Sequence, residues 1–432
     1  MALVLKNAHL IDPGEALDAV AEIAIGDDGR ISAIGSDLEV IEGAEVVDCM
    51  EKLVMPGLVD VHTHLREPGR EDEETVRTGT RAAALGGFTA VCAMPNTTPV
   101  ADEGSAIRFL LERAAAEGAV RVYAIGAITA GQKGDALAEI GDMVAEGAVA
   151  FSDDGCGVQK AAMMRLAMDY AKAFATTIVA HAEDESLAGS GSVNEGAVST
   201  ILGLPGIPAA AEDVMVARDI RLCELTGCRL HVAHVSTAGA LALVRDAKRR
   251  GLPVTCEVTP HHLFLSEDAL GSGYDTNLKM NPPLRTEADR EALVEGVVDG
   301  TVDCIASDHA PHAAHEKQLE FELAPFGTIG LQTALGLVNT HLVATGRITW
   351  DRLVELMCHG PRRCLALPEA HLAIGAVADL TIVDPEARVD VSPEWLASSS
   401  KNSAFLGNRL LGKATEVLVD GRFVLRGGKV VV

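Results

Sequence analysis

The chain has 432 residues, of which 48% are hydrophobic and only 3% aromatic, and its formal net charge is −26. Because this charge repels nucleic acids and anionic lipid surfaces, composition excludes both as general partners, and an anionic substrate would need a local cationic pocket. The length predicts one large α/β domain with a smaller domain attached.

The first residues and the cysteines favour a cytoplasmic protein. The opening sequence MALVLKNAHLIDPGEALD has no basic region, and no apolar stretch approaches roughly 18 residues, so we expect no export signal and no membrane span. The nine cysteines are odd in number, form no CxxC pair and lie mostly in apolar runs. We therefore expect reduced thiols in the core.

The flank from residue 1 to 55 shows short alternating strands with Asp-Gly turns, and residues 366–432 repeat this pattern. We expect the two ends to pair into one small β-sandwich domain around a central domain of residues 56–365.

One unit recurs through that central domain: a helix ends at a glycine, and a short apolar segment follows and ends at polar residues. With LVMPGLVDVHTH and TTIVAHAED there are eight such apolar segments, and eight strands alternating with helices are typical of a (β/α)8 barrel of the TIM type. A doubly wound open sheet is the alternative, but no glycine-rich nucleotide loop follows the first strand. The helix-ending glycines are Gly87, Gly118, Gly147, Gly227, Gly251 and Gly300.

Polar side chains gather where the predicted strands end, which is where barrel enzymes of this type carry their chemistry. In chain order these residues are His62, His64, Arg66, Asn96, Asp153, Asp154, His181, His234, His261, His262, Asp308, His309 and His312.

The first two histidines indicate a metal site. His62 and His64 are two residues apart on a strand, so their side chains point the same way, about 6 to 7 Å apart, and neutral imidazoles suit zinc. Four histidines and two aspartates exceed the ligands of one tetrahedral ion, so we expect two divalent ions bridged by hydroxide, with Asp154 as the shared carboxylate. Asp153 should point the other way and be structural.

Strand alternation also separates ligands from packing residues. His231 and His234 differ by three positions and should face opposite sides, so His234, nearer the strand end, is the expected ligand and His231 a packing residue that faces the helices. The roles of His261 and His262 stay open between packing and support of the site.

Arg66 lies on the same strand face as the two histidines. Its planar guanidinium can bind a carboxylate with two parallel hydrogen bonds, so we expect it to hold an anionic substrate. The alternative is a surface arginine paired with Glu67 or Glu71.

Eight motifs follow one another along the chain: VMPGLVDVHTHLREPG, AMPNTTP, AFSDDG, VAHAED, VAHVST, CEVTPHHL, NPPLR and ASDHAPH. In this order they resemble motifs of bacterial class I dihydroorotases of the amidohydrolase superfamily. The resemblance spans nearly the whole chain and implies zinc-dependent, reversible cyclisation of N-carbamoyl-L-aspartate to L-dihydroorotate in pyrimidine biosynthesis. Hydantoinases and allantoinases, the enzymatic alternatives, carry a carboxylated lysine at the fourth strand, whereas the nearest following lysine here is Lys160.

The resemblance also implies roles by position. Two zinc ions per subunit would be bridged by Asp154 and a hydroxide, and Asp308 would transfer protons as the catalytic residue. The remaining ligands would be His62 and His64, with Asp308, for one ion and His181 and His234 for the other. The substrate would contact His64, Arg66, Asn96, Asn281, His312, Phe326 and Gly327.

A noncatalytic dihydroorotase-like subunit that scaffolds aspartate transcarbamoylase is the alternative from another class, but such a protein would be expected to lack ligand histidines. We expect a homo-oligomer, while an aspartate transcarbamoylase complex, the native metal and its filling stay open. Residues 312–330 have the mixed charge of a loop that closes over the site, or of a solvated face.

Overall fold

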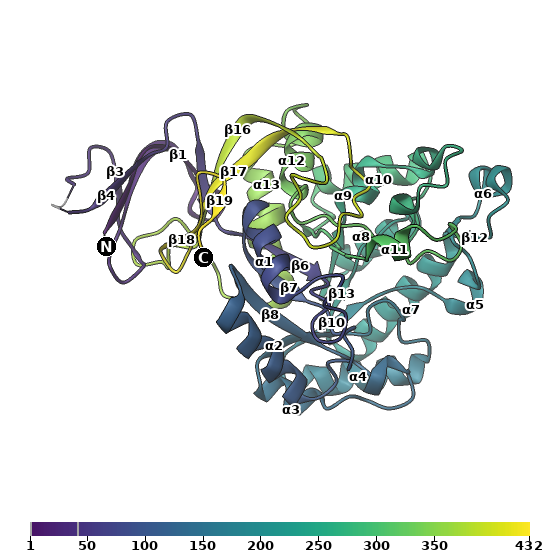
Figure 1. Ribbon diagram of the computed structural model, residues 1–432. Helices are drawn as coiled ribbons and strands as arrows, with labels where there is room; N and C mark the ends of the chain where they lie inside the picture. Colours follow the sequence, from purple (N-terminus) through teal and green to yellow (C-terminus); the bar gives the residue numbers. More distant parts are fainter. Residues whose placement is uncertain (1, 41–42) are drawn as a thin grey trace.

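The computed structural model describes residues 2–40 and 43–432, and within these residues eight parallel strands form a barrel (Figure 1). Neighbours in the barrel follow chain order, and a parallel bridge between Thr63 and His309 joins the last strand segment to the first. The predicted (β/α)8 fold is confirmed. The strands are β6 (Leu58–Thr63), β7 (Phe88–Ala93), β8 (Arg121–Gly126), β9 (Ala148–Ser152), β10 (Thr177–Ala180), β13 (Arg229–Val232), β14 (Val254–Val258) and β15 (Cys304–Ile305).

Helices connect these strands and cover the barrel. The longer ones are α1 (Val76–Leu85), α2 (Gly104–Glu117), α3 (Ile140–Ala145), α4 (Ala161–Lys172), α7 (Ala210–Thr226), α8 (Ala238–Arg249) and α10 (Glu287–Asp299). Shorter elements are α5 (Glu185–Ala188), β11 (Val193–Asn194), α6 (Ala197–Leu202), β12 (Gly206–Ile207), α9 (Pro260–Phe264), α11 (Ala314–Lys317), α12 (Ala334–Val338), α13 (Trp350–Val354) and α14 (Gly360–Leu365).

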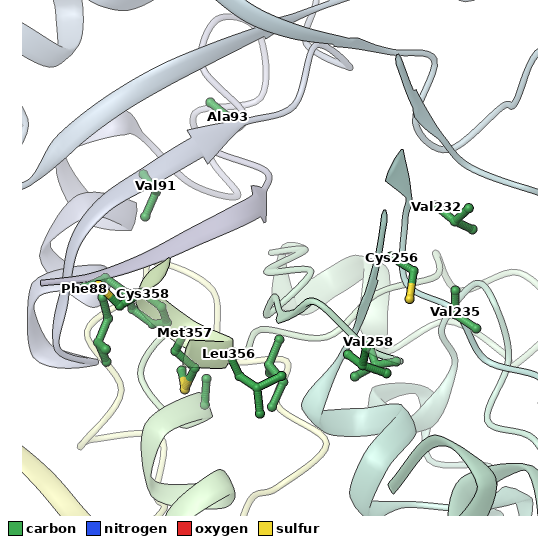
Figure 2. Close-up of a cluster of buried hydrophobic side chains, with 14 of the residues drawn as sticks. Phe88, Val91, Ala93, Val232, Val235, Cys256, Val258, Leu356, Met357 and Cys358 are labelled. Atoms are coloured by element: carbon green, nitrogen blue, oxygen red, sulfur yellow. The ribbon is translucent and has the colours of Figure 1, made fainter. Parts of the chain in front are cut away.

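Side chains alternate along the strands between two apolar layers. On β7, Val91 belongs to the layer between strands and helices, part of which Figure 2 shows, whereas Ala90 and Cys92 belong to the barrel interior. Helix α14 adds Cys364 to the interior cluster. Arg362 of the same helix donates to the carbonyl of Gly57, just before β6 begins, so α14 lies at the amino ends of the strands.

The glycines that were predicted to end helices lie at or just beyond helix ends. Gly118 differs from the others in its backbone conformation. Gly227 and Gly300 cap α7 and α10 in the left-handed region, with φ of 70° and 88°. Gly118 instead leaves α2 in an extended conformation, with φ of −70°, so any residue could adopt its backbone angles there.

Strands from both ends of the chain pair in a second sheet, which lies beside the barrel (Figure 1). Strand β5 joins the two ends, because it pairs in parallel with β1 and antiparallel with β16. Leu5, Ile23, Leu380 and Leu418 pack in its core. In the described residues the strands of this sheet are β1 (Leu3–Asp12), β2 (Leu17–Ile25), β3 (Ile31–Gly35), β4 (Glu45–Asp48), β5 (Leu53–Pro56), β16 (Leu380–Asp390), β17 (Arg409–Val419), β18 (Arg422–Arg426) and β19 (Lys429–Val430).

The structure also describes the cysteines and the apolar character of the helices. All nine cysteines are free thiols, and Cys156 is the exposed one. Across residues 2–40 and 43–432, no helix combines the length and apolar character that a membrane span requires.

Candidate metal centre and substrate cavity

Two clusters of potential metal ligands share Asp154, which follows β9. His62 and His64 form the first cluster with Asp154, and His181 and His234 form the second; within each cluster the ligand atoms lie within 4.8 Å of one another. Nε2 of His62 and Nε2 of His234 are each 3.4 Å from Oδ1 of Asp154. Nε2 of His64 is 3.5 Å from Oδ2, so both carboxylate oxygens face imidazoles.

Asp308 lies on the side of the first cluster. Its Oδ1 is 3.2 Å from Nε2 of His64 and 3.5 Å from Nε2 of His62. The structure therefore brings together all six residues that the sequence singled out as ligands, although they come from five different strand ends.

The donor atoms of this centre fit divalent metal ions. Nε2 of His62 and Oδ1 of Asp154 are buried and lack a hydrogen-bond partner, an arrangement that is costly in a protein interior unless a cation satisfies both. Imidazole nitrogens with carboxylate oxygens suit zinc and its first-row neighbours. Burial favours the neutral form of Asp154, yet the charge of His62 and the nearby imidazoles of His181 and His234 hold the pKa of its carboxyl well below its usual range.

Hydrogen bonds behind the cluster orient two imidazoles. Nδ1 of His62 lies 2.6 Å from Oε1 of Glu257, and Nδ1 of His64 lies 2.8 Å from Oδ1 of Asn96, which leaves both Nε2 atoms facing Asp154. The role of Glu257 was not predicted from the sequence. The available signal was a carboxylate inside an apolar strand, at a position that alternation places in the barrel interior.

The expectation for His231 was wrong. His231 lies in the barrel interior, where its Nε2 is 3.1 Å from Oε2 of Glu257 on β14. His234 reaches Asp154 because its backbone adopts φ of 33°, which breaks the regular alternation after β13 ends. Asp153 behaves as expected: its Oδ1 accepts from the backbone amides of Ile128 and Thr129.

A cavity of about 320 Å³ opens over this cluster. Most of its lining residues have polar or charged side chains, and each residue that was expected to contact the substrate is among them. Its lining includes His64, Arg66, Asn96, Asp154, His181, His234, Asn281, Asp308, His312, Phe326 and Gly327.

Relatives that match along the whole chain decide its family. The dihydroorotase of Anaeromyxobacter sp. (strain K) is 52% identical over 428 residues, covering 99% of this chain and 98% of that protein. The dihydroorotase of Pelotomaculum thermopropionicum is 51% identical over 426 residues, covering 99% of each. The chain belongs to the dihydroorotase family. The family model described as Dihydro-orotase-like also matches residues 51–240.

Solved structures with the same fold come from hydantoinases. The L-hydantoinase (dihydropyrimidinase) of Arthrobacter aurescens superposes with a TM-score of 0.90 at 27% identity, covering 100% of this chain and 97% of that one. The D-hydantoinase (dihydropyrimidinase) of Thermus sp. superposes with a TM-score of 0.86 at 26% identity, covering 99% and 96%. The dihydroorotase family thus shares its barrel with hydantoinases. The fold therefore does not determine the substrate, and the residues that line the cavity must do so.

Lys160 does not take part in this dihydroorotase-family centre. Its Nζ pairs with Asp135 at 2.7 Å, and both side chains are largely exposed. After the fourth strand it is Asp154 that contributes a ligand atom to both clusters.

The two histidines left open by sequence differ in their contacts. His262 is held on both sides, by Oγ1 of Thr259 at 2.8 Å and by the carbonyl of Pro282 at 2.9 Å. It thereby fixes the segment that carries Asn281 beside the cavity. His261 is buried, its Nε2 has no hydrogen-bond partner, and burial lowers its pKa to about 4.

Proposed function

We propose that this chain is a dihydroorotase that interconverts N-carbamoyl-L-aspartate and L-dihydroorotate in pyrimidine biosynthesis, with two zinc ions per subunit. The observation that carries the proposal is one cavity in which two candidate metal clusters sharing Asp154 face the guanidinium of Arg66. Full-length relatives that bear the name dihydroorotase support it.

In this proposal His62, His64 and Asp308 would hold one ion, His181 and His234 would hold the other, and Asp154 would be a ligand of both. When bound, the ions supply Lewis-acid chemistry: they lower the pKa of water toward about 7 and polarise the amide carbonyl. Nitrogen and oxygen ligands from the rigid ends of different strands fit such a site.

Asp308 is the group that moves protons. Its carboxylate lines the cavity next to His64, where it can take a proton from the attacking water and deliver it to the leaving ring nitrogen. Burial opposes its ionisation, but the neighbouring His62 and His64 hold its pKa below the usual range, so the carboxyl group is ionised.

The opposite side of the cavity recognises the substrate carboxylate. Arg66 supplies the cationic group that a chain with a net charge of −26 needs for binding an anion. Asn96 and His312 complete this pocket, and Asn281 with the backbone at Phe326 and Gly327 contacts the pyrimidine ring.

The proton balance makes the position of the equilibrium depend on pH. Ring closure joins the carbamoyl nitrogen to the side-chain carboxyl carbon and releases water, and it consumes one proton because a carboxylate becomes a neutral imide. We therefore expect lower pH to favour dihydroorotate and higher pH to favour carbamoyl aspartate.

An assay in both directions tests the proposal. We expect the zinc-replete protein to open dihydroorotate and to close carbamoyl aspartate, the chelated protein to do neither, and added zinc to restore both. Faster opening of hydantoin or allantoin would instead identify another cyclic amidase. A metal-loaded protein inactive on all three substrates would favour the scaffold subunit.

The organisation of the protein is part of the same proposal. Residues 56–365 form the barrel domain, and residues 1–55 with 366–432 form the β-sandwich domain of a cytoplasmic homo-oligomer. Light scattering of the purified chain tests the oligomer, and titration with an aspartate transcarbamoylase tests for a complex.

A further inference from the structure

A second group of metal-ligating side chains lies inside the barrel, away from the cavity. It consists of His231 from β13, Cys304 from β15 and Cys364 from α14, all at most 1% exposed. Their ligand atoms lie within 4.8 Å of one another. Three elements far apart in the sequence thus bring an imidazole and two thiols to one point.

The spacing of the two sulfurs matches a shared ion. Sγ of Cys304 and Sγ of Cys364 are 3.8 Å apart. Two sulfurs bound to one tetrahedral zinc at about 2.3 Å lie about 3.8 Å apart, whereas a disulfide holds them at about 2.0 Å. Because no two of the three ligand atoms lie more than 4.8 Å apart, an ion placed between them would lie at most about 2.8 Å from each.

The ligands are held in place by surrounding hydrogen bonds. Nδ1 of His231 is 2.8 Å from Oγ1 of Thr255, and its Nε2 is 3.1 Å from Glu257. Whichever nitrogen binds an ion, the other keeps a partner that fixes the ring, as in well-built metal sites. The carbonyl of Cys364 accepts from Oγ1 of Thr177 on β10, which ties α14 to the barrel wall.

The donor types suit a divalent ion. Cysteine sulfurs and imidazole nitrogens are the ligands that zinc prefers in structural sites. A closed interior tolerates buried thiolates only where a cation compensates their charge.

We propose that His231, Cys304 and Cys364 form a structural zinc site that fastens α14 to the barrel beneath the catalytic centre, with Glu257 available as the fourth ligand. Glu257 also contacts His62, so the site would stiffen the support of that imidazole. This metal would be additional to those of the proposed reaction.

Cobalt substitution of the full-length chain tests this site. The cavity cluster offers only nitrogen and oxygen ligands, so a sulfur-to-cobalt charge-transfer band in the near ultraviolet would report the cysteine site alone. We expect the wild-type chain to show this band, Cys304→Ser to lose it together with about one metal per chain, and Cys92→Ser to keep both. Cys92 is the matched control because it is buried in the same interior cluster.

Absence of the band in the wild-type chain overturns the proposal without any variant having to fold. So does an unchanged band in Cys304→Ser, or a wild-type mass lower by two hydrogens that shows a Cys304–Cys364 disulfide. Because the band does not depend on turnover, a chain inactive on dihydroorotate could still show it, and the two proposals fail separately.

Discussion

At the scale of single residues, Arg66 shows how a charge is prepared for a ligand inside a protein. Its side chain is 6% exposed, and its Nε lies 3.1 Å from the carbonyl of Pro311 and 3.1 Å from Oε2 of Glu73. These contacts hold one edge of the guanidinium, while the residue also lines the cavity. A lysine would keep the charge but could not form two parallel hydrogen bonds to a carboxylate.

We expect Arg66→Lys to lower kcat/KM for dihydroorotate by about tenfold to a hundredfold, since a bidentate charged hydrogen bond contributes about 1.5 to 3 kcal/mol. The change should appear mainly in KM, and metal content should stay unchanged. Steady-state kinetics with metal analysis measures this, and Arg108→Lys, at an exposed ion pair with Glu146, is the control. Unchanged kinetics would show that Arg66 does not hold the substrate.

Residues whose placement depends on regular strand geometry could be predicted from sequence, and those that depend on local exceptions could not. The spacing of His62 and His64 sufficed because β6 fixes which way they point. His231 was misplaced because the positive φ of His234 has no signature in the sequence. Glu257 was missed because its partners come from other strands.

At the scale of elements, the segment after β15 is fixed over the cavity by buried lysines. Nζ of Lys317 donates to the carbonyls of Thr276 and Pro325, and Nζ of Lys279 donates to the carbonyl of Ala324. The mixed charges that suggested a closing loop therefore include lysines that hydrogen-bond backbone carbonyls.

Within this segment Gly327 permits a close approach. Its φ is +134°, and an added Cβ would lie 2.7 Å from Cβ of Ala310 and 3.1 Å from Nε2 of His312. We expect Gly327→Ala to displace His312 and raise KM by about tenfold or more. The alanine would strain the backbone beside the substrate pocket by about 1 to 3 kcal/mol. Kinetics and thermal unfolding measure this. Gly273→Ala, where the added Cβ meets open space, should behave like wild type.

Helix α7 contains a carboxyl group whose burial gives stability a pH dependence. Burial raises the pKa of Asp219 to about 6, although Arg218 partly offsets it. The folded state then binds a proton more readily than the unfolded state, so this group destabilises the fold increasingly as pH rises from about 4 to about 6.

We expect Asp219→Asn to match wild type near pH 4 and to become more stable than wild type, by on the order of 2 kcal/mol, above pH of about 6. Denaturant unfolding at several pH values measures the difference. A stability difference between variant and wild type that stays constant with pH would show that the ionisation of Asp219 is not its cause.

At the scale of the whole molecule, Asp12 connects the two ends of the chain to the barrel. It is fully buried and accepts hydrogen bonds from the amides of Gly14 at 2.9 Å and Leu372 at 2.7 Å, and it pairs with Nε2 of His359 at 2.9 Å. Sequence patterns predicted that the two ends pair, but no pattern marked Asp12, because two of its partners, His359 and Leu372, lie about 350 residues away.

Asp12→Ala should lower the free energy of unfolding by about 3 kcal/mol, because it removes several charged hydrogen bonds and leaves buried donors without partners. Denaturant unfolding followed by circular dichroism measures the loss. Asp18→Ala removes an exposed carboxylate that pairs with His9 and should change stability by less than about 1 kcal/mol. Equal losses of stability in the two variants would show that Asp12 does not hold the two ends of the chain to the barrel.

The position of β5 between strands from opposite termini has a consequence for biosynthesis. While the ribosome is still making the barrel, the edge of β5 that β16 later occupies has no partner from its own chain. Such an open edge is a template for association with other polypeptides. Nascent chains that stall before Leu380 should therefore depend on chaperones far more than the finished protein does.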